Sequence, residues 1–414
     1  MKGRRAGRGA EAEGGGGIEG SRGKMLDERD IQERREEFAS LFGPGEPPRL
    51  YFAPGRVNLI GEHTDYNGGL VLPLAIEQGT YMLMRRVEAP PARLRSAAGG
   101  GDAAVDFDPA SIARRGDWAD YVLGVFAVLS REGRTPPPFE ALVFGDLPRE
   151  AGLSSSASLE VVSALAATGL GYPLGREEAA RVAWRAENEF VGVPCGIMDQ
   201  FAAALAEDGH ALLLDCRSEE YRQVPFNLPG AALVIGHTGV GRTLAGSAYR
   251  ERREECRAAL ALISRRVGTR EYLADVTMEE LEAARGVLPD TLYARARHVV
   301  EEQRRVVEAA ACLREGDPER LGALLNASHA SLRDLYRVSS PELDALQETS
   351  LRRPGVWGCR MTGAGFGGCV VALLERDALP AYLEAVPGLY RRAAGREPFF
   401  LVLERPAAGA RAIS

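Results

Sequence analysis

Residues 53–69 read APGRVNLIGEHTDYNGG, the stretch that says most about the fold and chemistry of this chain. Glycines and short apolar runs alternate there with side chains that donate and accept hydrogen bonds. Because each hydroxyl of a polyhydroxylated ligand needs both a donor and an acceptor, this mixture suits the recognition of a sugar. An Asx-rich turn, in which Asp65 and Asn67 bond their own backbone, is the structural alternative. A metal site at His63 and Asp65 would lack a third ligand nearby in the sequence.

A serine-rich segment, GLSSSASLE, covers residues 152–160 and leads into a helix with apolar residues at spacing three. Small residues at a helix start expose backbone N–H groups and the positive end of the helix dipole, which together bind phosphate. Serine hydroxyls add donors and can ligate magnesium. An ordinary serine N-cap is the alternative, although it explains one serine better than three. The chain contains no G-x-x-x-x-G-K-[ST], so a Walker-type P-loop is excluded.

A glycine segment, MTGAGFGGC, covers residues 361–369 and satisfies G-x-G-x-x-G. The strand-like run CVVALL follows it at residues 369–374, whereas a dinucleotide-binding fingerprint requires a helix there. We therefore expect these glycines to allow a close approach of the backbone to a ligand or to a neighbouring lobe.

Two carboxylates in the middle of the chain are candidates for catalysis or metal binding. Asp199 lies within VPCGIMDQF, in the first turn of a helix predicted to start near Gly196, where the helix dipole favours an ionised carboxylate. A helix-capping role is the alternative. Glu187 falls on the apolar stripe of the preceding helix and so points inward, where a carboxylate needs a partner. Magnesium, a buried Arg or Lys, and a set of backbone N–H groups are all open as that partner.

The composition describes a soluble globular protein with more than one lobe. The length of 414 residues exceeds the size at which a single core stops growing. No apolar run is long enough to span a bilayer, and the net charge of -7 argues against a nucleic-acid binder. The six cysteines show no metal-ligand spacing and no secretory signal is visible, so we expect reduced thiols in a cytoplasmic protein. Residues 1–24 are rich in Gly, Arg and Glu and predict a disordered tail, with Met25 as a candidate start of translation.

The apolar periodicity predicts strands and helices in both halves of the chain, and hence an α+β protein with a helix-bearing second lobe. The predicted strands are 51–53, 71–74, 80–87, 140–144, 370–374 and 399–403, and the predicted helices are 26–42, 119–131, 245–266, 278–285, 290–314, 318–336 and 377–385.

Taken together and in their order along the chain, the segments resemble the galactokinases, a family of the GHMP small-molecule kinase superfamily. Further agreement comes from residues 249–256, 297–300 and 328–334, and the resemblance covers about residues 30–405. It implies a two-lobe GHMP-kinase-like α+β fold with the active site between the lobes. A ribosomal-S5-domain-2-like lobe with the sugar and ATP-phosphate motifs would cover residues 25–218, and a ferredoxin-like lobe with extra helices residues 219–414.

The resemblance also implies an activity, namely ATP-dependent phosphorylation of the anomeric hydroxyl of galactose, with Mg²⁺. We expect a monomer that binds a small sugar and ATP, and neither nucleic acid nor membrane. The implied roles are catalysis by Asp199 and Arg56; sugar binding by Glu62, His63, Asp65, Gly196 and Tyr249; binding of the ATP phosphates by Gly152, Ser154, Ser155 and Ser156; and magnesium binding by Ser155 and Glu187.

Two departures from the family pattern keep other substrates open. Arg149-Glu150-Ala151 stand where the family usually carries glycines, and the segment HTGVGR at residues 237–242 differs from an Asn-Ser-Asn type of segment. The alternatives are a kinase for N-acetylgalactosamine, galacturonate or L-arabinose, and a sugar- and ATP-sensing regulator without catalysis. The presence of Arg56 and Asp199 speaks against the regulator.

Overall fold

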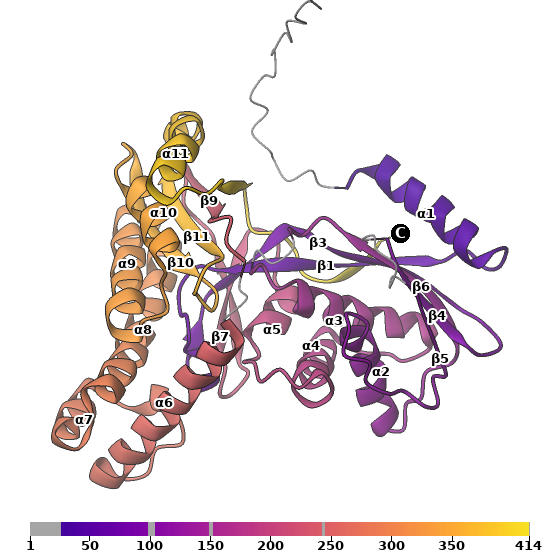
Figure 1. The fold of residues 1–414 in the computed structure, drawn as a ribbon, viewed down its shortest axis with the longest axis horizontal. Helices are drawn as coiled ribbons and strands as arrows, with labels where there is room; N and C mark the ends of the chain where they lie inside the picture. Colours follow the sequence, from indigo (N-terminus) through magenta and orange to yellow (C-terminus); the bar gives the residue numbers. More distant parts are fainter. Residues whose placement is uncertain (1–25, 98–103, 149–151, 242–244, 414) are drawn as a thin grey trace, which may run out of the picture.

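The computed structural model describes residues 26–97, 104–148, 152–241 and 245–413, with only the backbone at Ala245 and Gly246. The tail expected over residues 1–24, the candidate start Met25, the unusual Arg149–Ala151 and Arg242 lie outside the described residues. The described chain forms three β-sheets flanked by helices, and the helix-rich α6–α11 half lies to one side of a long sheet that contains β1 and β3 (Figure 1).

The largest sheet has six strands and builds the first lobe. Its order is β13 (Arg411–Ile413), β1 (Arg49–Asn58), β3 (Pro73–Arg86), β6 (Phe139–Gly145), β4 (Ala92–Ser96) and β5 (Ala104–Phe107). Neighbouring strands are antiparallel except for β4 and β6, which are parallel. Strand β13 comes from the C-terminal end, so the chain returns to its first sheet before it ends.

The alternation of side chains along β1 decides which helices cover which face of this sheet. Tyr51 and Ala53 join the core beneath α2 (Asp120–Arg131), α3 (Ser155–Ala166), α4 (Arg176–Arg185) and α5 (Met198–Leu205). Leu50 and Phe52 point the other way, toward α1 (Glu28–Phe42). Both faces are therefore buried, and Figure 1 shows α1 and the α2–α5 layer on opposite sides of the sheet.

A four-stranded antiparallel sheet forms the centre of the second lobe. Its order is β10 (Val356–Thr362), β11 (Cys369–Glu375), β9 (Ala231–His237) and β12 (Phe399–Leu403). Val371 faces α8 (Asp290–Glu315) and α9 (Pro318–Ser331), whereas Val370 faces the core shared by α6 (Ala245–Val267), α10 (Pro341–Leu351) and α11 (Leu379–Ala394).

The two lobes share a hydrophobic core. Val57 and Ile60 at the end of β1 belong to the same cluster as Ile235 of β9 and Leu325 of α9. A small third sheet of β2 (Leu70–Val71), β7 (His210–Asp215) and β8 (Tyr221–Pro225) lies beside this junction. Its β7–β8 hairpin crosses residue 218, where the sequence analysis divides the chain.

The predicted elements are present, but several of their bounds differ. The strands predicted at 71–74 and 80–87 belong mainly to one strand, β3 (Pro73–Arg86). The strands that the sequence did not predict are β4, β5, β7, β8, β9, β10 and β13. Strand β1 runs on to Asn58 because a register shift between Pro54 and Arg56 absorbs the Pro-Gly pair that suggests a strand end. Helix α11 continues to Ala394 although Pro387 lies inside it. The predicted 318–336 helix is α-helical only to Ser331 and ends in the π-helical turn Leu332–Tyr336. Among the described residues, no helix combines the length and the apolarity that a membrane span needs.

Candidate active site

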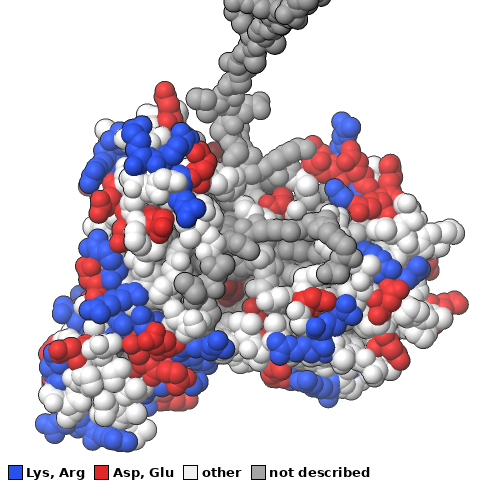
Figure 2. All heavy atoms as spheres, in the orientation of Figure 1, with Lys and Arg blue, Asp and Glu red and all other residues white. Residues whose placement is uncertain are grey.

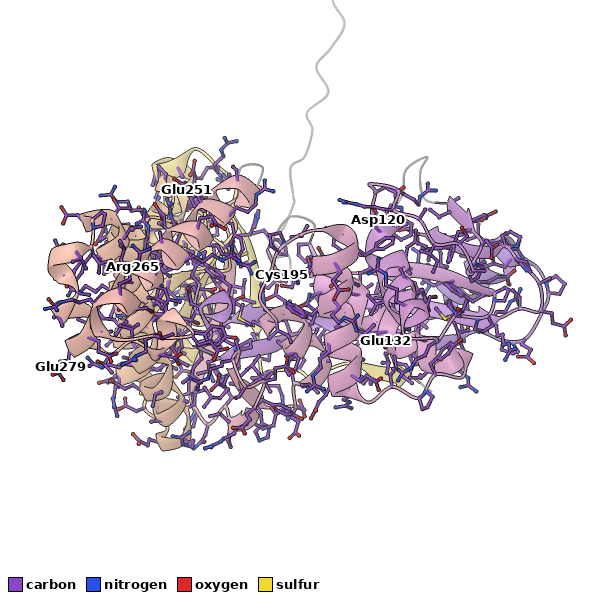
Figure 3. All side chains as sticks on the ribbon, turned by 90° about the horizontal axis from the view of Figure 1, so that it is seen from below. Asp120, Glu132, Cys195, Glu251, Arg265 and Glu279 are labelled. Carbon is purple, nitrogen blue, oxygen red and sulfur yellow. The ribbon has the colours of Figure 1, made fainter. Side chains whose placement is uncertain are left out.

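A cavity of ≈ 440 Å³ lies where both lobes contribute loops and helix starts. The loop after β1, the segment before α5, the start of α6 and the loop after β10 all reach its wall. Figure 3 shows Cys195, one of the lining residues, between the helices that carry Glu251 and Asp120. Seven of the residues predicted from the sequence line this cavity together: Arg56, Glu62, His63, Asp65, Gly196, Asp199 and Tyr249.

The carboxylate of Asp199 is held from one side and open on the other. Arg56 donates from Nε to Oδ1 at 2.8 Å and from Nη2 to Oδ2 at 2.7 Å. The Arg56 side chain is 5% exposed and that of Asp199 is 29% exposed, so the carboxylate still faces the cavity. Burial by itself lowers the pKa of Arg56, but the charge and hydrogen bonds of Asp199 outweigh it and raise the pKa above its ordinary value. Asp199 makes no cap of its own helix, so the capping alternative is wrong.

The serine segment contributes to the same arrangement from the start of α3. Ser154 donates its hydroxyl to Asp199 Oδ2, and Arg56 Nη1 donates to the carbonyl oxygen of Gly152 at 2.9 Å. Ser154 has a left-handed backbone and makes no side-chain cap, so the ordinary N-cap does not describe it. Ser155 is exposed and Ser156 half-buried beside it, at a helix start whose first N–H groups suit a phosphate.

The carboxylate of Glu62 is buried and is held by the glycine segment of the second lobe. Its Oε1 accepts hydrogen bonds from the Gly363 backbone N–H at 2.7 Å and from the Thr362 hydroxyl at 3.0 Å. Arg360, fully buried, places Nη2 3.0 Å from the same oxygen and donates from Nη1 to the carbonyls of Asn58 and Leu59. The close approach expected of these glycines is thus confirmed, and a Cβ at Gly365 would lie 2.1 Å from the Val338 carbonyl oxygen.

Arg360 is not among the site residues predicted from the sequence. A charged residue inside the otherwise uncharged strand Val356–Thr362 is the signal that could have found it, because a buried guanidinium requires a buried acceptor.

Asp65 packs directly on the backbone of Gly196. A Cβ at Gly196 would lie 1.9 Å from Asp65 Oδ2, so no other residue fits there without displacing the carboxylate. Burial raises the pKa of Asp65 to about 7, and the charges of Asp199 and Glu62 add to the effect. Asp65 therefore changes its charge near neutral pH.

His63 is enclosed by aromatic rings. Its ring lies 4.7 Å from that of Tyr336 and 5.8 Å from those of Tyr66 and Tyr249. Its backbone is left-handed, with φ 61°, and Asn67 Nδ2 donates to its carbonyl oxygen at 2.7 Å. Burial, with a further contribution from His298, lowers the pKa of His63 to about 3, so the ring is neutral. Tyr66 and Tyr336 are not among the residues that the sequence analysis selected.

Glu187 lies behind Asp199 in a buried polar cluster. Gln200 donates from Nε2 to Glu187 at 2.6 Å and to Glu160 at 3.0 Å, and the Cys195 thiol donates to Glu187 at 3.4 Å. Burial and then the charge of Asp199 raise the pKa of Glu187. No Arg or Lys pairs with Glu187 within the part of the chain that the structure describes, and its hydrogen-bonding partners include Gln200, Cys195 and Ser156. Neither Glu160 nor Gln200 was selected from the sequence.

The donor set around Glu187 fits magnesium. Mg²⁺ takes oxygen ligands and binds through one or two carboxylates together with phosphate oxygens and waters. Glu187 supplies a carboxylate without a cationic partner, and Ser156 hydrogen-bonds it from the serine segment. In the described ranges no group of three His, Cys, Asp or Glu side chains forms a metal cage, so an ion bound here would share its ligands with a nucleotide.

Three family signatures match the chain. The galactokinase galactose-binding signature matches residues 36–86, the N-terminal domain of GHMP kinases matches residues 120–207, and the C-terminal domain of GHMP kinases matches residues 309–391. Arg56, Glu62, His63 and Asp65 all fall within the first of these.

Whole-chain comparisons agree with the signatures. A galactokinase of Roseiflexus is 44% identical over 368 residues, which cover 89% of this chain and 93% of the relative. The human galactokinase is 44% identical over 379 residues, which cover 90% and 94%. The crystal structure of Lactococcus lactis galactokinase in complex with galactose matches with a TM-score of 0.89 and 38% identity, over 92% of this chain and all of that one. A mevalonate kinase structure, at 18% identity and a TM-score of 0.62, shares the fold. This chain belongs to the galactokinase family of the GHMP kinases.

Proposed function

We infer that the protein transfers the γ-phosphoryl group of ATP to the anomeric hydroxyl of galactose, giving galactose 1-phosphate and ADP. One observation carries the inference: the Arg56–Asp199 pair opens into a cavity whose wall includes the residues of the galactose-binding signature. The proposed substrate follows from the signature residues in the cavity wall, which would hold the sugar. The proposed reaction follows from the Arg56–Asp199 pair, which would meet the anomeric hydroxyl of that sugar.

Asp199 acts on the sugar hydroxyl as an orienting group and late proton acceptor. A carboxylate is a far weaker base than the alkoxide of a sugar, so early deprotonation of the hydroxyl is unfavourable. Phosphoryl transfer depends chiefly on alignment and charge neutralisation. Arg56 serves both needs, since it holds both oxygens of Asp199 and brings a fixed positive charge beside the transferring group.

We propose that Glu62, His63, Asp65, Gly196 and Tyr249 bind the sugar, and that Gly152 and Ser154–Ser156 contact the ATP phosphates. Ser155 and Glu187 would hold Mg²⁺, which when bound neutralises charge on the phosphates. We also propose a cytoplasmic monomer whose lobes divide near residues 218/219, with strand β13 returning to the first lobe and β8 pairing with β7 across the division. Among the described residues on the face shown in Figure 2, Arg side chains are interspersed with Asp and Glu and form no single basic surface of the kind that nucleic acid requires.

A coupled ADP-release assay with galactose, N-acetylgalactosamine, galacturonate, L-arabinose and glucose tests the inference. We expect the largest kcat/KM with galactose and no turnover with glucose. A larger kcat/KM with one of the other three sugars would reassign the substrate. Absence of ADP release with all five sugars would refute kinase activity.

Substituting Gly196→Ala is expected to weaken sugar binding. The added Cβ would lie 1.9 Å from Asp65 Oδ2, and a displacement of about 1 Å at a binding group can cost up to about a hundredfold. Steady-state kinetics should show the sugar KM raised about tenfold or more, with the ATP KM changed less than about twofold. Gly286→Ala is the matched control, because a Cβ at that position meets nothing within 4 Å. An unchanged sugar KM in the Gly196 variant would contradict the placement of the sugar beside Asp65.

The kcat/KM for galactose is expected to fall as the pH drops below about 7. The pKa of Asp65 is raised to about 7, so the carboxylate is protonated below that pH and accepts fewer hydrogen bonds from the sugar. Because kcat/KM reports groups of the free enzyme, a pH profile with galactose as the varied substrate measures this step directly.

In the Asp65→Asn variant, kcat/KM for galactose should be lower than in the wild type and should depend less on pH below about 7. As a control, Asp106→Asn removes a carboxylate paired with Arg95 on the far side of the first lobe and should leave this pH dependence in place. If kcat/KM of Asp65→Asn still falls at low pH as in the wild type, a group other than Asp65 causes the fall.

A further inference from the structure

A chain of hydrogen bonds leads from the second lobe to His63. The Cys256 sulfur of α6 lies 3.0 Å from the Tyr336 hydroxyl, that hydroxyl lies 2.8 Å from the Tyr66 hydroxyl, and the Tyr66 hydroxyl lies 2.9 Å from His63 Nδ1. Cys256 and Tyr336 are buried, and Tyr66 is half-buried. These hydrogen bonds end at His63, whose ring lines the cavity together with Tyr249.

Each hydroxyl in such a chain carries one proton, so all members point in the same direction. His63 is neutral and carries a single ring proton, on Nδ1 or on Nε2. If Tyr66 donates to Nδ1, the proton sits on Nε2; if Nδ1 donates to Tyr66, Nε2 is a bare acceptor. The bond made by one ring nitrogen therefore sets the role of the other.

The last bond of the chain favours donation toward His63. A phenol is the better donor and a bare imidazole nitrogen the better acceptor, so Tyr66 donates to His63 Nδ1. The Tyr66 hydroxyl has a single proton, so Tyr336 donates to Tyr66. The Tyr336 hydroxyl is then left to accept from the Cys256 thiol.

Neighbouring rings on both sides hold the Tyr336 ring in place. Tyr336 lies between His63, at 4.7 Å, and His298, at 4.6 Å. His298 is itself bonded to the Ser331 hydroxyl at 2.8 Å and to the Glu62 carbonyl at 3.1 Å. At the other end, His63 Nε2 is buried and no hydrogen bond of good geometry reaches it in the described part of the protein, although the Ala364 backbone also interacts with the ring and raises its pKa. An orphaned polar atom in a cavity wall is costly unless a ligand satisfies it.

We propose that Tyr66 and Tyr336 are positioning residues that hold His63 as the Nε2–H tautomer, so that it donates a hydrogen bond to an oxygen of the sugar. The inference rests on the proposed sugar-binding role of His63. The proposal makes His63 Nε2 the donor in the contact with the sugar. It also predicts that the hydroxyls of Tyr66 and Tyr336 affect sugar affinity without touching the sugar.

The tautomer can be measured without any turnover. In full-length protein labelled with ¹⁵N-histidine, only 5 histidines contribute, and a His63→Gln spectrum identifies the resonances of His63. Because the pKa of His63 is about 3, we expect a neutral Nε2–H ring throughout the neutral range. In Tyr66→Phe, Nδ1 loses its donor, and the Nδ1–H form should appear. A wild-type Nδ1–H ring, or a tautomer unaffected by Tyr66→Phe, would overturn the proposal.

Kinetics supply the second arm. Loss of one neutral hydrogen bond corresponds to about a threefold to tenfold change, so Tyr66→Phe and Tyr336→Phe should raise the galactose KM by that factor while the ATP KM stays within about twofold. Tyr382→Phe is the matched control, since it removes a buried hydroxyl bonded to Ser350 at 2.7 Å, in the α10–α11 part of the second lobe. A panel of monodeoxy-galactoses should show one hydroxyl whose removal costs the wild type more than either Phe variant.

The two arms separate the possible failures. If galactose is not phosphorylated but the tautomer responds to Tyr66→Phe, the proposed function fails and the positioning chain stands. If galactose is phosphorylated normally and both Phe variants keep the wild-type KM, the positioning role is refuted and the proposed function stands.

Discussion

Asp199→Asn is expected to lower kcat by about a hundredfold to ten-thousandfold while galactose still binds. Asparagine has nearly the same shape and keeps one oxygen toward Arg56, but it can neither accept the proton of the sugar hydroxyl nor balance the guanidinium charge. Single-turnover phosphoryl transfer measures the loss, and calorimetric titration with galactose measures the binding that remains.

The same exchange at a carboxylate far from the cavity is the control. Asp208→Asn removes an exposed partner of Arg405 and should leave kcat unchanged. Near-normal turnover in Asp199→Asn would show that the Arg56-bound carboxylate is not the group that meets the hydroxyl.

Arg360→Met is expected to destabilise the protein by about 3–5 kcal/mol. The guanidinium is fully buried, so its removal takes the paired cation from the buried carboxylate of Glu62 and leaves the carbonyl of Leu59 without a donor. The carbonyl of Asn58 keeps the Thr362 hydroxyl as a donor. Urea unfolding measures the loss of free energy. The galactose KM should rise as well, because Glu62 is no longer held at the cavity wall.

Two further variants show whether burial is the cause. Arg391→Met breaks an ion pair with Glu397 in which the side chains are 57% and 67% exposed, and it should cost at most about 1 kcal/mol. The double variant Arg360→Met/Glu62→Gln should recover part of the stability, because it leaves no unpaired buried charge. Equal losses in Arg360→Met and Arg391→Met would show that burial does not set the contribution of Arg360 to stability.

Much of the secondary structure could be predicted because it depends on short windows of sequence. The 290–314 helix and the 399–403 strand follow from apolar repeats and are present as α8 and β12. Errors arose where a neighbour decided the outcome, as at Pro54-Gly55, where pairing with β3 carries the strand past two residues that usually end one.

The site residues were located by their motifs and by resemblance to a family, but their contacts were not. Asp199 could be a helix cap or a catalytic group, and Ser154 a cap or a phosphate ligand, because each local pattern fits both roles. The structure decides against both caps, since Asp199 turns to Arg56, 143 residues earlier in the chain, and Ser154 turns to Asp199.

By itself, the sequence of this protein determined the family, many of its helices and strands, and which short segments carry polar side chains among glycines. Only the tertiary structure decided that Arg360 neutralises Glu62 and that Tyr336 reaches Tyr66 across 270 residues. The physical reason is that helix and strand periodicity act over a few neighbouring residues. The partner of a buried charge or hydroxyl is instead chosen by how two sheets pack around one shared core.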